Sequence, residues 1–121
     1  MNQTQTVSYP QIQINLNSST FQELLIEATD QTFSKLGAPI KHTLYSCLET
    51  NYKLTKEDIP NRIDDFVNAL EQIFETSASL IEIDVMKNMQ QKIPLFKFKI
   101  ENTHLNFQDY LKSLKSFTET L

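Results

Sequence analysis

The sequence predicts a mostly α fold, a bundle of four to five helices, with a small two-stranded sheet formed by segments near the N- and C-termini. Five segments have the apolar spacing of amphipathic helices. The chain has one glycine, Gly37, in 121 residues, and 40% of its residues are apolar, which suffices for a hydrophobic core. We expect residues 1–10 to form a flexible polar arm and residues 11–121 a single helical domain.

Two segments have the period of a half-buried strand. Apolar and polar side chains alternate in residues 11–16 and again in 95–100, and the apolar ones are Ile12, Ile14, Leu16, Phe96, Phe98 and Ile100. Because an isolated strand edge is unstable, these segments need partners. We expect them to pair with each other within one chain, or alternatively between two chains.

The first two helices are marked by their ends. Thr20 and Glu23 have the spacing of a capping box, so the first helix is expected to start at Thr20. Gly37 favours a left-handed stop, and Pro39 suits the first turn of a second helix over about 40–52.

The third helix has the most regular pattern and is expected to open at Ile59 and Pro60. Its apolar residues recur at helical spacing, namely Ile63, Phe66, Val67, Leu70, Ile73 and Phe74. Acidic residues in its first turns complement the helix dipole.

The fourth helix is predicted to be apolar around most of its circumference. Ser79 and Glu82 are expected to cap it, and Pro94 ends it. Its apolar residues are Leu80, Ile81, Ile83, Val85, Met86 and Met89, and its narrow polar stripe holds Asp84, Lys87, Asn88 and Gln91. A helix with this distribution belongs in the centre of a bundle or at an oligomer interface.

The fifth helix is predicted to begin at an Asn106 cap that bonds to Asp109. Its inward residues are expected to be Phe107, Tyr110, Leu111, Leu114 and Phe117.

The residues that could carry out chemistry are few and scattered. His42 and His104 are the only histidines, and neither has other ligands at metal-binding spacing. Cys47 falls on an apolar stripe, where a free cysteine behaves as a small hydrophobic residue. Glu82 and Asp84 are interpreted as the solvent side of their helix, or alternatively as a polar contact within an interface. We therefore expect no enzyme activity, no metal and no cofactor.

The charge is distributed unevenly along the chain. Residues 1–85 carry five basic and twelve acidic side chains, whereas residues 86–121 carry six basic and three acidic ones. The acidic part argues against nucleic-acid binding. No stretch is long and apolar enough for membrane insertion, no signal peptide is recognisable, and the lone cysteine fits a reducing compartment, so we expect a cytoplasmic protein.

Residues 21–93 contain motifs that resemble a known family. They include the Leu36–Gly37 turn, the segments 45–49 and 56–60, and the run from Phe66 to Phe74 followed by Ala78. This stretch resembles the Nitrosopumilus output domain family of small archaeal helical domains. The resemblance implies an association with signalling proteins and carries over no catalytic residues.

The sequence favours a non-catalytic helical protein-interaction or regulatory module, a signalling output, that binds another protein or a second copy of itself as a homodimer. The residues expected to make the interaction are Val85, Met86, Met89, Lys97, Lys99, Lys112 and Lys115. The alternative is a small-ligand sensor, with an apolar pocket between the fourth helix and the strand at 95–100.

Overall fold

The structure is a computed structural model that describes residues 18–94, 96 and 106–120. Within this part of the chain all regular elements are helical, which confirms the predicted mostly α bundle. The elements are α1 (Ser18–Ser34), α2 (Ala38–Tyr52), the 3₁₀ helix η1 (Lys56–Asn61), α3 (Ile63–Phe74), the 3₁₀ turn η2 (Glu75–Ser77), α4 (Ala78–Lys92) and α5 (Phe107–Glu119).

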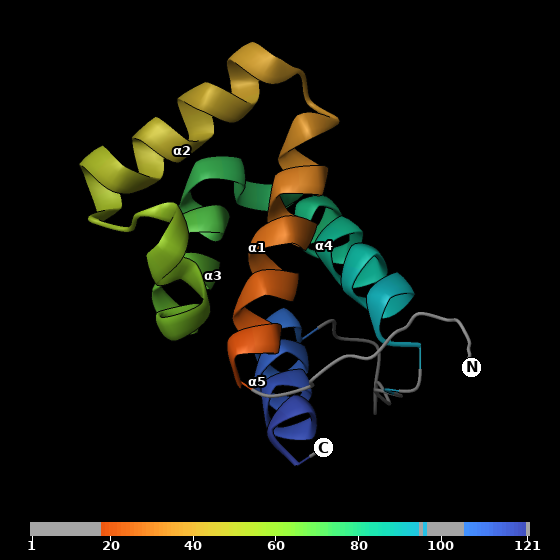
Figure 1. Ribbon diagram of the computed structural model, residues 1–121. Coiled ribbons are helices and arrows are strands. Elements are labelled where there is room, and N and C mark those ends of the chain that lie inside the picture. The colour runs from red at the N-terminus through yellow and green to blue at the C-terminus, as the bar shows by residue number, and fades with distance from the viewer. Residues whose placement is uncertain (1–17, 95, 97–105, 121) are drawn as a thin grey trace, which may run out of the picture.

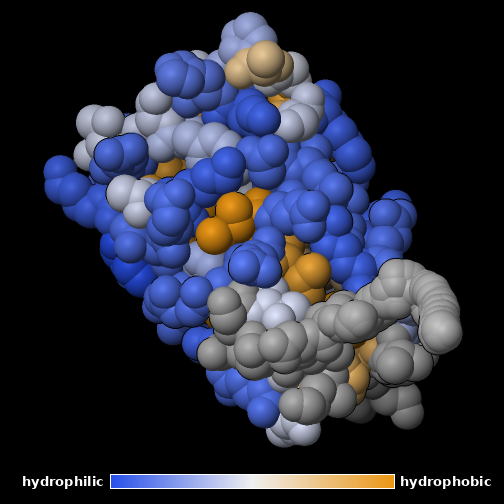
Figure 2. All heavy atoms as spheres, in the orientation of Figure 1, coloured by the Kyte–Doolittle hydropathy of each residue, from blue (hydrophilic) through white to orange (hydrophobic). Residues whose placement is uncertain are grey.

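Helix α1 runs through the middle of the bundle and contacts α2, η1, α4 and α5 (Figure 1). Four of its side chains, Phe21, Leu25, Ala28 and Phe33, are completely buried. They join one core cluster with residues of every other α-helix. The visible face is mostly hydrophilic, with small groups of hydrophobic atoms near its centre (Figure 2).

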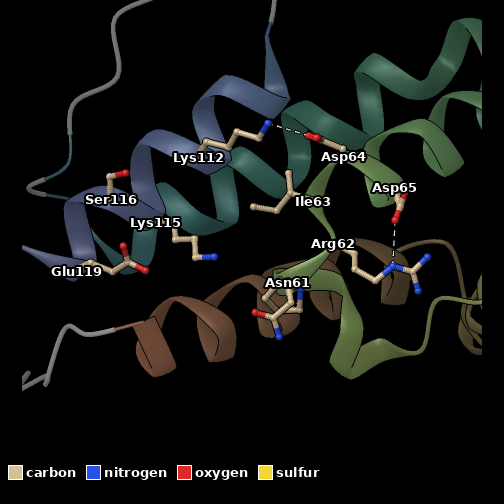
Figure 3. Close-up of a pocket in the computed structure, with 10 residues that line it drawn as sticks. Asn61, Arg62, Ile63, Asp64, Asp65, Lys112, Lys115, Ser116 and Glu119 are labelled. Carbon is tan, nitrogen blue, oxygen red and sulfur yellow. Dashed lines mark hydrogen bonds and ion pairs between the residues drawn. The ribbon is translucent and has the colours of Figure 1, made fainter.

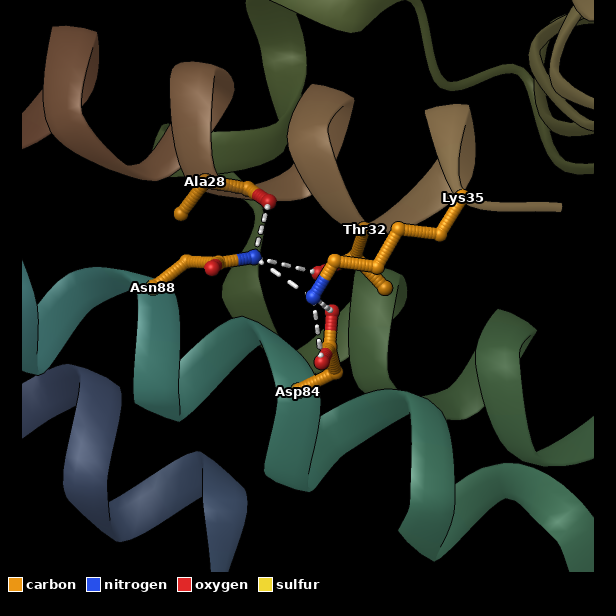
Figure 4. A network of polar contacts seen from close by, with 5 residues as sticks. All are labelled: Ala28, Thr32, Lys35, Asp84 and Asn88. Carbon is orange, nitrogen blue, oxygen red and sulfur yellow. Dashed lines mark hydrogen bonds and ion pairs between the residues drawn. The ribbon is translucent and has the colours of Figure 1, made fainter. Parts of the chain in front are cut away.

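Helix α4 is held against α1 by polar contacts as well as apolar packing (Figure 4). The buried Asn88 amide donates to Thr32 Oγ1 at 3.0 Å and to the carbonyl of Ala28 at 3.4 Å. One turn earlier, Asp84 accepts from the Lys35 ammonium at 2.8 Å. These directional bonds fix which turns of the two helices lie side by side.

Several predicted helix ends are confirmed. Gly37 has a φ of +103° between α1 and α2, and α2 starts with Pro39 in its first turn. At α5 the Asn106 side chain accepts from the backbone N–H of Asp109 at 2.9 Å. Both are local signals, formed by residues at most three positions apart.

Other predicted ends were wrong. Helix α1 already begins at Ser18, so Thr20 lies within it instead of capping it. Ile59 and Pro60 belong to η1, and α3 starts only at Ile63, because the Thr55–Asp58 capping box starts a separate 3₁₀ helix.

Helix α4 departs furthest from its predicted pattern. It begins at Ala78 without a side-chain cap, and Glu82 is buried instead of capping. Asn88, predicted to be on the polar stripe, is buried as well, whereas Leu80 is 69% and Ile83 is 39% exposed.

The segments expected to form the sheet and the polar arm fall largely outside the described residues. This applies to residues 1–17 and to 95 and 97–105, so neither the arm nor strand pairing is described. Phe96 is described; it has no strand conformation and packs against Tyr110 and Phe117, with ring centroids 5.6 and 5.2 Å away.

Candidate functional site

An open groove of about 630 Å³ lies between the start of α3 and helix α5. Its lining comes from η1, from the first turn of α3 and from the polar face of α5 (Figure 3). The lining residues are Pro60, Asn61, Arg62, Ile63, Asp64, Asp65, Lys112, Lys115, Ser116 and Glu119.

Local sequence explains how each wall is formed. On α5, the residues Lys112, Lys115, Ser116 and Glu119 are spaced by three and four positions, so they share one helix face. On the other side the chain changes from η1 to α3 at Arg62, and the turn exposes the polar residues at the start of α3. Ile63, which is 7% exposed, lies between the walls.

Most charges of the groove are arranged in ion pairs. Lys112 Nζ lies 2.9 Å from Asp64 Oδ1, and Gln108 also donates to Asp64. Arg62 Nε donates to Asp65 Oδ2 at 3.0 Å. The hydrogen bonds from Lys112 and then from Gln108 hold the pKa of the Asp64 carboxyl below its usual value. Asp64 is therefore ionised at neutral pH, and both acids already have a basic partner.

Lys115 differs from these charges. Its side chain is half-buried and extends from α5 into the groove (Figure 3). Its ammonium has no hydrogen-bond or ion-pair partner within the described part of the chain. The Ser116 hydroxyl and the Asn61 amide line the same groove and can donate further hydrogen bonds. The groove thus offers the free ammonium of Lys115, the exposed carboxylate of Glu119 and neutral donors beside a small apolar surface.

The structure separates the residues predicted to make the interaction. Val85 and Met89 are 0% and 1% exposed, so they belong to the core, which corrects their expected place at an exposed interface. Met86 is half-buried against the core. Lys112 and Lys115 lie together in the groove, whereas Lys97 and Lys99 fall outside the described residues.

The groove also contains residues that the sequence analysis did not select, chiefly Arg62, Asp65, Ser116 and Glu119. A signal for the α5 residues was present, because they repeat at helical spacing with the two predicted lysines. No comparable signal linked them to Arg62 and Asp65, which are about fifty positions earlier in the sequence.

The residues considered for chemistry remain apart. His42 is exposed, and His104 falls outside the described residues. Cys47 is half-buried instead of fully buried, and its sulfur accepts from the Asn51 amide at 3.2 Å. In the described residues no group of three or more potential ligands could hold a metal ion. The pocket expected beside residues 95–100 falls outside the described residues except at Phe96.

A second charged cluster joins α1, α2 and η1. Asp30 accepts from Lys56 at 3.1 Å, from Lys41 at 3.4 Å and from the Tyr45 hydroxyl at 3.2 Å. Burial alone would raise the pKa of the Asp30 carboxyl, but these hydrogen bonds hold it below its usual value. The Asp30 carboxylate is fully engaged within this cluster. We interpret the cluster as a set of contacts that stabilises the packing of α1 against α2 and η1.

The chain matches no protein-family model, no curated protein and no solved structure. The resemblance to the Nitrosopumilus output domain family therefore stays a prediction. Among the described residues, none of the helices has the length and apolar character needed to cross a membrane.

Proposed function

We propose that this chain is a non-catalytic protein-interaction or regulatory module that works in the cytoplasm and binds an acidic segment of another protein. The observation that supports this proposal is Lys115, a half-buried side chain in the groove between α3 and α5 whose ammonium has no partner among the described residues. Partial burial lowers the hydration of a cation, so a carboxylate brought into the groove gains a charge-assisted hydrogen bond.

The other charges of the groove affect which kind of segment binds more than how tightly it binds. Asp64 and Asp65 are already bound by Lys112 and Arg62, so they do not compete for Lys115. Glu119 also lines the groove and makes no ion pair within the described part of the chain, but it is exposed, whereas the Lys115 side chain is half-buried. A carboxylate that reaches Lys115 therefore gains more than an ammonium that reaches Glu119, and the groove favours an acidic over a basic segment.

Binding to a panel of immobilised peptides of equal length, acidic, neutral or basic, tests this function. We expect the wild-type chain to prefer acidic peptides and Lys115→Glu to lose at least about tenfold in affinity, because an attraction becomes a repulsion. Lys87→Glu is the matched control, since Lys87 is an exposed lysine on α4 outside the groove. Equal binding of all three peptide classes, or equal loss in both variants, would contradict the proposal.

Self-association remains part of the proposal, and it involves a different surface. Leu80 and Ile83 are exposed and three positions apart, so they form a small apolar patch on the outer face of α4. If two copies meet there, sedimentation at increasing concentration will show a dimer that Leu80→Glu abolishes. A monomer at all concentrations would remove the homodimer from the proposal.

A further inference from the structure

Glu82 is a carboxylic acid within the apolar stripe of α4. It is four residues after Ala78, three before Val85 and seven before Met89, so the four side chains share one helix face. All four are buried, and Glu82 is only 6% exposed. Glu82 thus occupies a position that this helix otherwise gives to core residues.

Among the described residues, no hydrogen-bond donor or cation compensates for the burial of the Glu82 Oε2 atom. This atom is buried and makes no hydrogen bond within them. Neither α3 nor η2, which both pack against α4, contains a Lys or Arg. Lys35, which follows α1, is bound to Asp84, and Lys112 of α5 is bound to Asp64.

The one charged group that acts on Glu82 across the contact has the same sign. It is Glu71 of α3, and it disfavours ionisation of Glu82. Glu75 in η2, and Asp109, Lys115 and Glu119 on α5, make no ion pair with Glu82. Burial, and then the Glu71 charge, raise the pKa of the Glu82 carboxyl to about 7.

We propose that Glu82 is a pH-sensitive switch built into the fold: its protonated carboxyl permits close packing of α4, and loss of the proton loosens α4 from the core as the pH rises through neutrality. A neutral carboxyl is tolerated at an apolar position, whereas an unpaired carboxylate draws water towards it. The switch does not involve the groove and does not depend on the proposed function. A change in the protonation of Glu82 would shift α4 and, with it, the exposed apolar patch of Leu80 and Ile83.

The direction of the pH dependence follows from the raised pKa. In the unfolded chain the carboxyl has its ordinary pKa of 4.5. Above that value the unfolded state loses its proton while the folded state keeps it, so unfolding becomes easier until the pH passes the folded-state pKa. The aspartates with shifted values, Asp30, Asp58, Asp64 and Asp84, have lowered pKa values and are ionised throughout this window.

Urea unfolding of the full chain between about pH 5 and 8 tests the switch. For the wild type we expect the unfolding equilibrium constant to rise by roughly fiftyfold more than for Glu82→Gln, which cannot lose a proton. Glu71→Gln is the matched control on α3, since it removes the like charge but leaves the switch. The unfolding equilibrium constant of Glu71→Gln should rise less than that of the wild type, and the rise should end at a lower pH.

Two further measurements locate the effect and keep the test decisive. Hydrogen exchange should show that α4 amides lose protection with rising pH beyond the intrinsic rate increase, while α2 amides do not. If Glu82→Gln fails to fold, the ¹³C signal of the wild-type Glu82 carboxyl is titrated by NMR. A midpoint near 7 supports the switch. A midpoint near 4.5, or identical urea profiles for the wild type and Glu82→Gln, overturns it.

Discussion

The two flanks of α4 each bury one polar side chain, with different results. On the flank towards α1, Asn88 is 7% exposed and its amide bonds to Thr32 Oγ1 and to the carbonyl of Ala28. On the flank towards α3, Glu82 is 6% exposed, and its Oε2 atom has no hydrogen-bond partner in the part of the chain that the structure describes.

The difference between the flanks lies in what the neighbouring helix supplies. Helix α1 presents a hydroxyl and a carbonyl at hydrogen-bonding distance, so burial of Asn88 stabilises one alignment of the two helices. Helix α3 presents Glu71, which repels the ionised form of Glu82. Although the two side chains are equally buried, Asn88 stabilises the contact between α4 and α1, whereas Glu82 destabilises the contact between α4 and α3 when it is ionised.

Val85, which lies between the two flanks on the same helix, allows the strongest test of this view. Val85→Glu places a second unpaired carboxylate in the core, where Val85 is fully buried. We expect a loss of more than about 4 kcal/mol in the free energy of unfolding, which is a large fraction of the stability of a domain of this size.

The control for this variant is Leu80→Glu on the exposed face of the same helix, where Leu80 is 69% exposed. Its stability should stay within about 0.5 kcal/mol of the wild type. Circular dichroism during thermal unfolding distinguishes the two variants. A Val85→Glu chain that unfolds cooperatively near the wild-type temperature would show that α4 is not a core helix.

The same substitution on both flanks should have opposite effects. At pH 8, Glu82→Leu removes an unpaired carboxylate and should stabilise the chain by about 2 kcal/mol. Asn88→Leu leaves the buried partners of the amide without a donor and should destabilise it by about 1–2 kcal/mol.

Urea unfolding at two pH values checks this pair of variants. Because the folded-state pKa of Glu82 is raised, the gain from Glu82→Leu should be smaller at pH 5 than at pH 8, whereas the loss from Asn88→Leu should be the same at both. If both variants changed the stability in the same direction, the contrast between the flanks would be wrong.

A substitution in η2, the turn between α3 and α4, is expected to change the stability less than those on α4. Glu75 has a φ of 53° and a ψ of −123°, a backbone conformation that is strained for a residue with a side chain. Glu75→Gly should raise the free energy of unfolding by about 1 kcal/mol, because glycine adopts this conformation without strain.

Glu75→Ala is the matched control, because it removes the carboxylate but keeps the strain. It should give little or no gain in stability when the urea midpoints of the two variants are compared. A gain from alanine equal to that from glycine would attribute the effect to charge instead of backbone strain.

Features that depend on a few neighbouring residues were determined by the sequence alone. The Asn106 cap of α5, the positive φ of Gly37 and the apolar stripe of α3 could be predicted, because capping bonds, backbone sterics and helical periodicity act over at most a few turns. The mostly α fold class follows from the same local signals.

Only the tertiary structure decided which face of α4 is buried. Six apolar residues spread around this helix, so its sequence does not favour one face, and the shape and polarity of α1, α3 and α5 make the choice. Leu80 and Ile83 were therefore left outside, while Asn88 and Glu82 were buried. The spacing of Glu82 from Val85 and Met89 was visible in the sequence, but nothing local indicated that this stripe faces the core.

The position of the groove was likewise decided by the tertiary structure. Its walls come from α5 and from the start of α3, and contacts between distant segments cannot be read from periodicity within either one. Lys112 and Lys115 could be selected as charged surface residues from the sequence. In the structure Lys112 forms an ion pair with Asp64, whereas the Lys115 ammonium has no partner among the described residues. The packing of α3 against α5 decided this difference, because an ion pair forms only where the fold brings the two charges within a few ångströms of each other.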